Sequence, residues 1–232
     1  MGLTRFPNGV FATPNIGAGR LADMFASDNL WFVDGDGGNA GNTGSSPTDA
    51  VILPSAAVTL ASRGGVVYIK PRATIASAQT YYVDNITFPV TKPGLQLLGC
   101  GDSDNPYLGV DIKASTVTSP VITVNGAAVV LDSMRIAGTG QTADTASIVA
   151  VSNNGTTTRA YGFTIRNSRL ANGKGHLISA GAAISIDTAI MCKIQNCKFS
   201  DNLASITARS VYAAMQGLHI TDCTFGGTAL SG

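Results

Sequence analysis

The chain has 232 residues, of which 12% are charged and 44% are hydrophobic. This composition excludes a disordered chain, because disorder requires few apolar residues and many charges. The 15 Lys and Arg nearly balance the 14 acidic residues, so a net charge of +1 provides no basic field for nucleic acid or an anionic membrane. Every acidic residue is Asp, and 27 residues are Gly, which favours strands and turns over a helical bundle.

The first 30 residues show little periodicity and are interrupted repeatedly by proline and glycine. We expect an extended arm over 1–30 that orders on a partner surface, because such a segment cannot bury its own apolar side chains. The residues expected to contact that partner are Arg5, Phe6, Pro7 and Phe11. The opening residues lack the charged and apolar regions of a secretion signal, and no run of residues is apolar enough to span a membrane.

The next segment predicts a folded domain that begins near residue 31. Residues 30–33 predict a short strand, and the Gly- and Asn-rich run after it predicts a loop. A helix is expected over 54–62, because Pro54 suits the first helical position and glycines follow its end. Residues 66–69 then predict a strand. Asp34 and Asp36 in the loop are interpreted as turn residues, with a bound ion left open, because the spacing lacks the other ligands of a calcium loop.

A hidden repeat occupies the rest of the chain. Four segments share the pattern apolar, two polar, small or apolar, polar, apolar, and a fifth, 97–100, keeps only the first half. The first residues of the four full copies lie 34, 29 and 26 positions apart, and this spacing indicates a solenoid of about six coils. The four full copies are Leu131–Ile136, Ile165–Leu170, Ile194–Phe199 and Ile220–Phe225.

Stacked coils bury their inward side chains against one another, about 4.8 Å apart, so like residues should lie on like. We also expect Asn167, Asn196 and Asp222 to line up at one corner, where an amide can bond along the stack. The predicted core stack comprises Ile165, Ser168, Leu170, Ile194, Cys197, Phe199, Ile220, Cys223 and Phe225.

Candidate chemistry is sparse. The aspartates are scattered rather than paired, and His176 and His219 form no metal pattern with nearby residues. The four cysteines are expected to be free, buried thiols rather than disulfides. We therefore predict no catalytic, cofactor-binding or metal-binding residue, and a protein that is not an enzyme.

The repeats, the opening Phe32-Val33-Asp34, the helix and the strand after Gly65 together resemble the pectin-lyase-like superfamily, as found in phage tailspikes and virion decoration proteins. This resemblance covers roughly 31–227. It implies an all-β, right-handed, single-stranded parallel β-helix whose N-terminal end is plugged by the short helix. Residues 3–10 separately resemble the opening of structural proteins encoded beside phage capsid genes.

These resemblances imply a structural phage protein that decorates or cements the capsid surface and is made in the host cytoplasm. The arm would dock on the major capsid protein. Because little sequence follows Phe225, we expect sister subunits to cover the apolar end of the solenoid. The resemblance to phage β-helix proteins, which are usually threefold, and the threefold sites of capsid lattices imply a homotrimer. The alternative is a tailspike or fibre domain that binds or depolymerises a host surface polysaccharide, as a lyase or hydrolase does.

Overall fold

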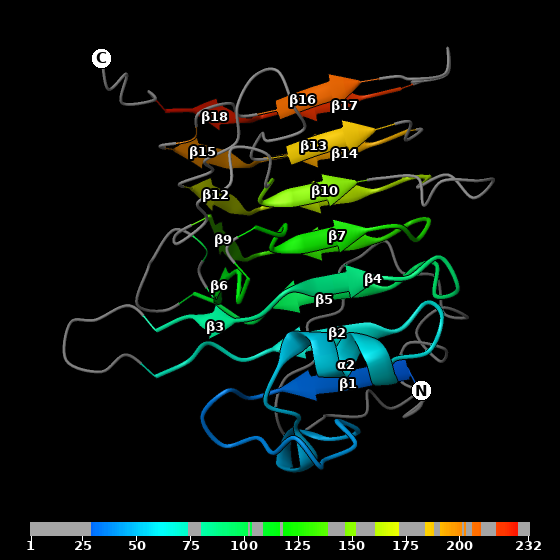
Figure 1. Cartoon of the computed structure of the whole chain (residues 1–232), viewed down its shortest axis with the longest axis vertical. Coiled ribbons are helices and arrows are strands. Elements are labelled where there is room, and N and C mark those ends of the chain that lie inside the picture. The colour runs from blue at the N-terminus through cyan, green and yellow to red at the C-terminus, as the bar shows by residue number, and fades with distance from the viewer. Residues whose placement is uncertain are drawn as a thin grey trace, which may run out of the picture.

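The computed structural model consists of three parallel sheets wound around one core (Figure 1). It describes residues 29–73, 80–101, 103, 109–116, 118–138, 147–151, 161–171, 184–187, 191–200, 202, 206–209 and 217–226. Residues 1–28, including Arg5, Phe6, Pro7 and Phe11 of the predicted arm, lie outside this description.

The first sheet contains the strands β1 (Leu30–Val33), β2 (Val66–Ile69), β5 (Gln96–Gly99), β8 (Val130–Asp132), β11 (Thr164–Arg166), β14 (Lys193–Gln195) and β17 (His219–Thr221). The second contains β4 (Ile86–Phe88), β7 (Ile122–Val124), β10 (Val149–Val151), β13 (Ile184–Asp187) and β16 (Ile206–Arg209). The third contains β3 (Tyr82–Val83), β6 (Asp111–Lys113), β9 (Arg135–Ala137), β12 (Arg169–Ala171), β15 (Lys198–Ser200) and β18 (Thr224–Phe225).

Each coil adds one strand to each sheet, from β2–β3–β4 to β14–β15–β16, and every pairing is parallel. The predicted parallel β-helix is therefore confirmed. The described residues form five complete coils, with β1 before them and β17 and β18 after them, rather than the six estimated. The estimate of about six includes the last coil, of which β17 and β18 are described.

The core is built from in-register rows of branched and aromatic side chains. Leu97, Leu131, Ile165 and Ile194 pair in succession along the first sheet, and each is 0% exposed. A similar row of Ile112, Ile136, Leu170 and Phe199 follows the third sheet. Each buried side chain of this size contributes about 1.5–3 kcal/mol of hydrophobic stabilisation.

The N-terminal end of the solenoid is covered. Helix α2 (Pro54–Leu60) lies within the predicted range, has Pro54 in its first turn, and buries Ala57 and Val58. It packs against β1, β2 and β4. A 3-10 helix, η2 (Pro47–Asp49), lies in the loop before it, and the backbone of that loop bonds the free edge of β1, where Phe32 donates to the carbonyl of Gly44 at 2.8 Å.

The C-terminal end is open among the described residues. Strands β16, β17 and β18 stand last in their sheets. Ile220 is 43% exposed and Phe225 is 52% exposed, although both continue rows that are buried one coil earlier. In the described part of the chain, no helix is long and apolar enough to cross a membrane.

Candidate functional site

The corner between the first and third sheets has an unusual backbone. Ser133, Asn167, Asn196 and Asp222 stand there on successive coils with φ of 57°, 50°, 47° and 54°. This left-handed conformation is strained for most side chains but tolerated by Asn and Asp, whose short polar groups bond locally. The local sequence of the repeat thus explains why the chain turns here and passes directly into the next strand.

The corner side chains form a hydrogen-bonded ladder along the solenoid. The Asn196 amide donates to Oδ1 of Asn167 at 2.9 Å, and the Asn167 amide donates to Oδ1 of Asp132 at 2.9 Å. Arg166 closes the ladder by bonding the other Asp132 oxygen at 2.6 Å. The alignment expected for Asn167 and Asn196 is therefore present, and Asp132 is a member that the repeat pattern did not identify.

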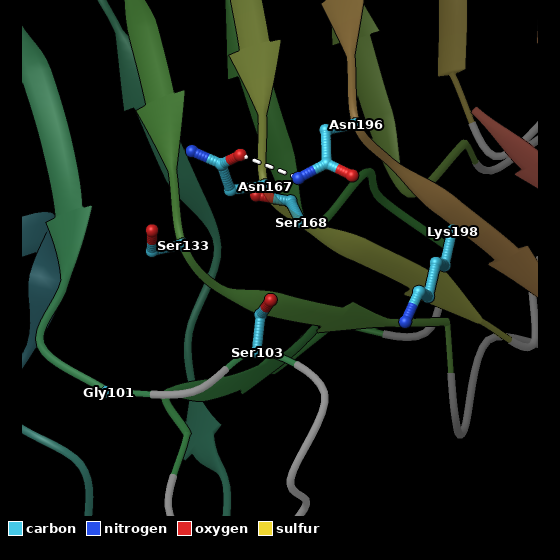
Figure 2. Close-up of a pocket in the computed structure, with 7 residues that line it drawn as sticks. All are labelled: Gly101, Ser103, Ser133, Asn167, Ser168, Asn196 and Lys198. Atoms are coloured by element: carbon cyan, nitrogen blue, oxygen red, sulfur yellow. Dashed lines mark hydrogen bonds between the residues drawn. The ribbon is translucent and has the colours of Figure 1, made fainter. Parts of the chain in front are cut away.

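A pocket of about 290 Å³ opens beside this ladder (Figure 2). Its walls come from the corner, from the segment after β5 and from β15. The residues that line it are Gly101, Ser103, Ser133, Asn167, Ser168, Asn196 and Lys198. Every side chain in the lining is polar, so the pocket suits a ligand rich in hydrogen-bonding groups rather than an apolar one.

Positive charge follows the outer face of the third sheet toward this pocket. Arg135, Arg169 and Lys198 pair in register on three consecutive coils. Asp111 precedes them in the same row and lies 3.4 Å from Arg135, with both side chains largely buried. The pair therefore lies at the start of the row, and Arg169 and Lys198 continue the row on the next two coils.

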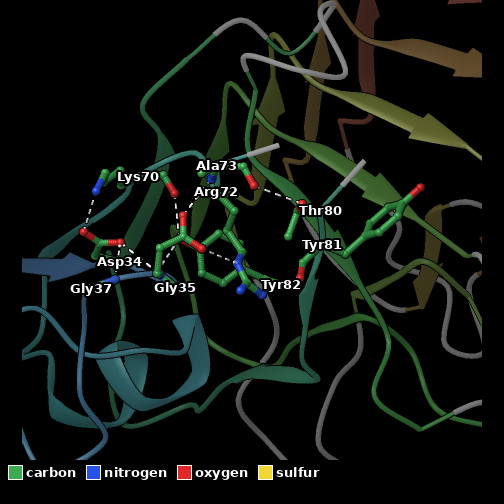
Figure 3. Close-up of polar contacts among 10 residues, drawn as sticks. Asp34, Gly35, Gly37, Lys70, Arg72, Ala73, Thr80, Tyr81 and Tyr82 are labelled. Atoms are coloured by element: carbon green, nitrogen blue, oxygen red, sulfur yellow. Dashed lines mark hydrogen bonds and ion pairs between the residues drawn. The ribbon is translucent and has the colours of Figure 1, made fainter. Parts of the chain in front are cut away.

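A second polar cluster joins the first loop to the strands above it (Figure 3). Lys70 bonds Asp34 at 2.6 Å, and Arg72 bonds Asp36 at 3.1 Å. Burial raises the pKa of Asp34, but hydrogen bonds from Lys70 and from the amides of residues 37 and 36 outweigh it and hold this pKa below its ordinary value. Asp34 thus stabilises the turn of this loop, and Asp36 ties the loop to Arg72, in agreement with the interpretation of both as turn residues.

Tyr82 anchors that cluster from below. Its hydroxyl donates to the carbonyl of Lys70 at 2.6 Å and accepts from the amide of Gly35 at 3.0 Å. The ring is 1% exposed, and burial raises the pKa of its phenol well above the ordinary value. A side chain at Gly35 would lie 2.7 Å from this ring, so only glycine fits there.

Asp84 also has a structural partner. Asp84 is buried and accepts from the amide of Ser55 at 2.7 Å, at the start of α2. Burial raises its pKa, although this hydrogen bond opposes the shift. No group of three or more His, Cys or acidic residues within the described ranges is arranged to hold a metal ion.

The predicted core stack is assembled row by row. Ile165 pairs with Ile194, and Ile194 with Ile220; Leu170 pairs with Phe199, and Phe199 with Phe225. The members on the two inner coils are at most 2% exposed. Ile220, Cys223 and Phe225 differ from the expected burial, because no described coil follows them.

The cysteines are all free, as expected, but not all are buried. Burial raises the pKa of Cys192 to about 11 and that of Cys197 to about 12. Cys100 is exposed, contrary to expectation. The chain leaves the corner at this residue and begins β6 only at Asp111, so Cys100 is not covered by a directly following strand.

No family model and no curated protein matches the sequence. Among solved structures, the chain is similar to pectin methylesterase PemA from Erwinia chrysanthemi, with 14% identity and a TM-score of 0.42. The alignment covers 86% of this chain and 66% of that enzyme, so the chain spans just under two thirds of its length.

Proposed function

We propose that the chain is a non-catalytic structural protein of a phage particle, a decoration or cement protein on the capsid surface. Residues 1–30 form the arm in this proposal, and Arg5, Phe6, Pro7 and Phe11 contact the major capsid protein. The resemblance of residues 3–10 to phage structural proteins supports this role. The fold alone does not distinguish it from enzymes, since one architecture serves many activities.

The observation that carries the proposal is the use of the carboxylates. A glycosidase needs two carboxyl groups that face one bound sugar, one as acid and one as base or nucleophile. Among the described residues, five of the carboxylates instead pair with a cation or a backbone amide from another part of the fold. These pairings are Asp34 with Lys70, Asp36 with Arg72, Asp84 with Ser55, Asp111 with Arg135, and Asp132 with Arg166.

Assembly through the C-terminal end is the second part of the proposal, with a second copy of this chain as the occupant. Ile220 and Phe225 present apolar surface beside the outer edges of β17 and β18. Unpaired strand edges and apolar surface are normally covered in stable proteins. Because α2 and the loop before it cover the N-terminal end, copies do not stack head to tail into a filament, and the assembly is closed. A homotrimer is the closed assembly that we propose.

Sedimentation at micromolar concentration tests assembly. Phe225→Glu places a charge on this end and should convert the oligomer to a folded monomer. Val83→Glu is the matched control, since Val83 is also an exposed apolar strand residue, 46% exposed, but lies near the covered end. A wild-type protein that sediments as a monomer would contradict the oligomer.

Particle binding tests the arm. Deletion of residues 1–28 should leave a folded oligomer that no longer co-sediments with capsids lacking the protein, whereas the full chain does. Equal binding of both proteins would show that the arm does not attach the protein.

A tailspike or fibre domain acting on a host polysaccharide is the second candidate, favoured by the fully polar lining of the pocket beside the ladder. Incubation with host capsular or wall polysaccharide distinguishes the two. Release of reducing ends or unsaturated products would replace the structural role with a depolymerase.

A further inference from the structure

We propose that residues 21–28 of the arm dock on the outer face of the first sheet of the same chain and cover an apolar surface on its first coils. This surface, which we call the aromatic face, comprises Leu30, Phe32, Val66, Tyr68 and Leu98. The inference goes beyond the proposed function, because it concerns the last part of the arm and leaves residues 1–20 for the partner.

The outer face of the first sheet changes from apolar to polar along the solenoid. Phe32, Tyr68 and Leu98 pair in register on β1, β2 and β5, and they alternate with buried residues whose side chains point into the core. The apolar part of this row is confined to the end of the sheet at which the arm joins it. On the later coils the same row continues with the polar side chains of Asp132, Arg166, Gln195 and Thr221.

The aromatic face is flat and partly shielded from water. The rings of Phe32 and Tyr68 stack with their centroids 5.8 Å apart and their planes at 18°. Leu30 and Leu98, on either side of this stack, are half-buried, and burial raises the pKa of the Tyr68 phenol. Contiguous apolar surface of this kind marks an interaction site in soluble proteins.

The described elements that pack on these strands lie within the sheet, at its edge or on its inner side. Within the sheet, β2 packs on β1 and β5. Helix α2 contacts β1 and β2 through the core, since its buried residues Ala57 and Val58 belong to the same hydrophobic cluster as Trp31 and Val67. Alternate residues of a strand point to opposite faces, so α2 and the aromatic face lie on opposite sides of the sheet. The cover of the aromatic face is therefore either a segment outside the described residues or a second molecule.

The arm is the segment with the shortest path to this face. It joins β1 at Asn29, and β5 lies two strand spacings away, about 10 Å (Figure 1). Three extended residues span about 10 Å, so the chain from Ala26 to Asn29 is long enough to reach Leu98. Because the arm is tethered at that point, its effective concentration at the face is high, which favours it over a separate molecule.

Residues 21–28 have the composition that such a docked segment needs. Leu21, Met24 and Phe25 follow one another at intervals of three and one, so a single helical turn places all three on one side. The other residues of the segment are small or acidic and suit exposure to water.

Disulfide trapping in the full chain tests where the arm lies. The background carries Cys100→Ser and Cys223→Ser, which remove the two cysteines that are not fully buried. Ala26→Cys is then combined with Gln96→Cys, whose position on β5 pairs in register with Val66 of the aromatic face. Diamide oxidises the two introduced thiols to a disulfide, and mass spectrometry measures the rate of closure within one chain.

Ser45→Cys, combined with Ala26→Cys in the same background, is the matched control. Ser45 is exposed and follows Gly44, whose carbonyl accepts from the amide of Phe32 at the free edge of β1. It therefore lies one strand spacing from β1, closer than Gln96, but in the loop rather than on the sheet. We expect the Gln96 pair to close at least about tenfold faster than the Ser45 pair, because docking holds the arm on one side of β1.

Two substitutions in the arm show whether apolar contacts hold it. Phe25→Ser should slow closure of the Gln96 pair by about tenfold or more, the factor expected when a buried aromatic side chain is lost. Phe11→Ser should leave the rate unchanged, because Phe11 belongs to the part of the arm assigned to the capsid. Co-sedimentation with capsids tests the proposed function independently of both results.

Three results would overturn the proposal. Closure of the Gln96 pair no faster than that of the Ser45 pair would show that the arm does not rest on the aromatic face. An equal effect of Phe25→Ser and Phe11→Ser would remove the apolar contact. Disulfide-linked pairs of chains, in a mixture of the Ala26→Cys protein with the Gln96→Cys protein, would assign the face to a second copy.

Discussion

Two neighbouring coils of the solenoid carry the same repeat but differ in how far their core side chains are buried. At the inner coil, Ile194 and Phe199 are 0% and 1% exposed, whereas their in-register neighbours Ile220 and Phe225 on the last described coil are 43% and 52% exposed. The sequence pattern is the same in both. Burial in a solenoid is therefore supplied by the next coil, not by the residue itself.

The N-terminal end shows how this protein supplies such a cover. Helix α2 buries Ala57 and Val58 over the first coils, and the loop before it bonds the edge of β1. Tyr82 and the ion pairs of Asp34 and Asp36 then attach the loop to the strands above. One end thus uses an intrachain cover, and our proposal assigns the cover of the other end to a second copy.

The largest difference in stability is expected between two variants in which an inner or an outer cysteine is replaced by aspartate. Cys197→Asp should lower the free energy of unfolding by about 3–5 kcal/mol, the cost of an uncompensated buried charge. Cys223→Asp should cost much less in the monomer, because this residue is half-buried. Urea unfolding measures both values, and Cys197→Ser is the mild control, since Ser168 occupies the equivalent position one coil earlier. Equal losses at Cys197 and Cys223 would show that the last coil is as well covered as the inner one.

Truncation of the stacked phenylalanines should give the next largest difference. Phe199→Ala should cost about 3–5 kcal/mol, the usual loss for a buried aromatic side chain. Phe225→Ala removes a ring that stacks on Phe199 at 5.0 Å but is half exposed, so the loss in the monomer should be less than about half as large. If the protein forms the proposed oligomer, the stability lost in Phe225→Ala should increase with protein concentration. Thermal melts at two concentrations measure this increase.

A smaller effect is expected at the covered end from Tyr82→Phe. The hydroxyl accepts from the amide of Gly35 and donates to the carbonyl of Lys70, and its removal deletes both hydrogen bonds. The free energy of unfolding should therefore fall by about 2 kcal/mol. Tyr161→Phe is the control, because that tyrosine is 49% exposed. No loss at Tyr82 would mean that the loop is held by its ion pairs alone.

The smallest effect concerns the pH dependence of Asp34. Its folded pKa lies below the ordinary value of 3.8, so its stabilisation is fully present above that pH and is lost as the pH falls through the folded pKa. Asp34→Asn should therefore be less stable than the wild type at neutral pH, with the difference shrinking below about pH 4. Unfolding curves at pH 7 and pH 3 measure this difference, and a difference at pH 3 as large as at pH 7 would contradict the assignment.

The sequence predicted the corner between the first and third sheets because the pattern there is local. An apolar residue, a left-handed polar residue and a second apolar residue recur within six positions, as in Ile194–Phe199. The second sheet gave no such signal, because the connections into β10, β13 and β16 vary in length and separate these strands from the repeat. The fold class could thus be predicted from one corner, while the five described strands of the second sheet could not.

The candidate pocket could not be predicted for a different reason. Ser103, Asn167 and Asn196 lie on three segments that only the stacking of coils brings together. The pairing of Asp111 with Arg135 depends likewise on register across a long connection. A signal for the ladder did exist, since polar turn formers recur at the corner, but the role of Asp132 required the observed register.

In-register stacking has a consequence for how the length of this protein can change. Because Leu131, Ile165 and Ile194 occupy one row, removal of the residues from 165 to 193 would bring Ile194 directly onto Leu131 and close the gap with like against like. The corner would keep its conformation, since Asn196 would take the place of Asn167 next to Asp132. A coil is thus a unit that duplication or deletion of a gene segment can add or remove whole, and the height of the solenoid can evolve independently of its two ends.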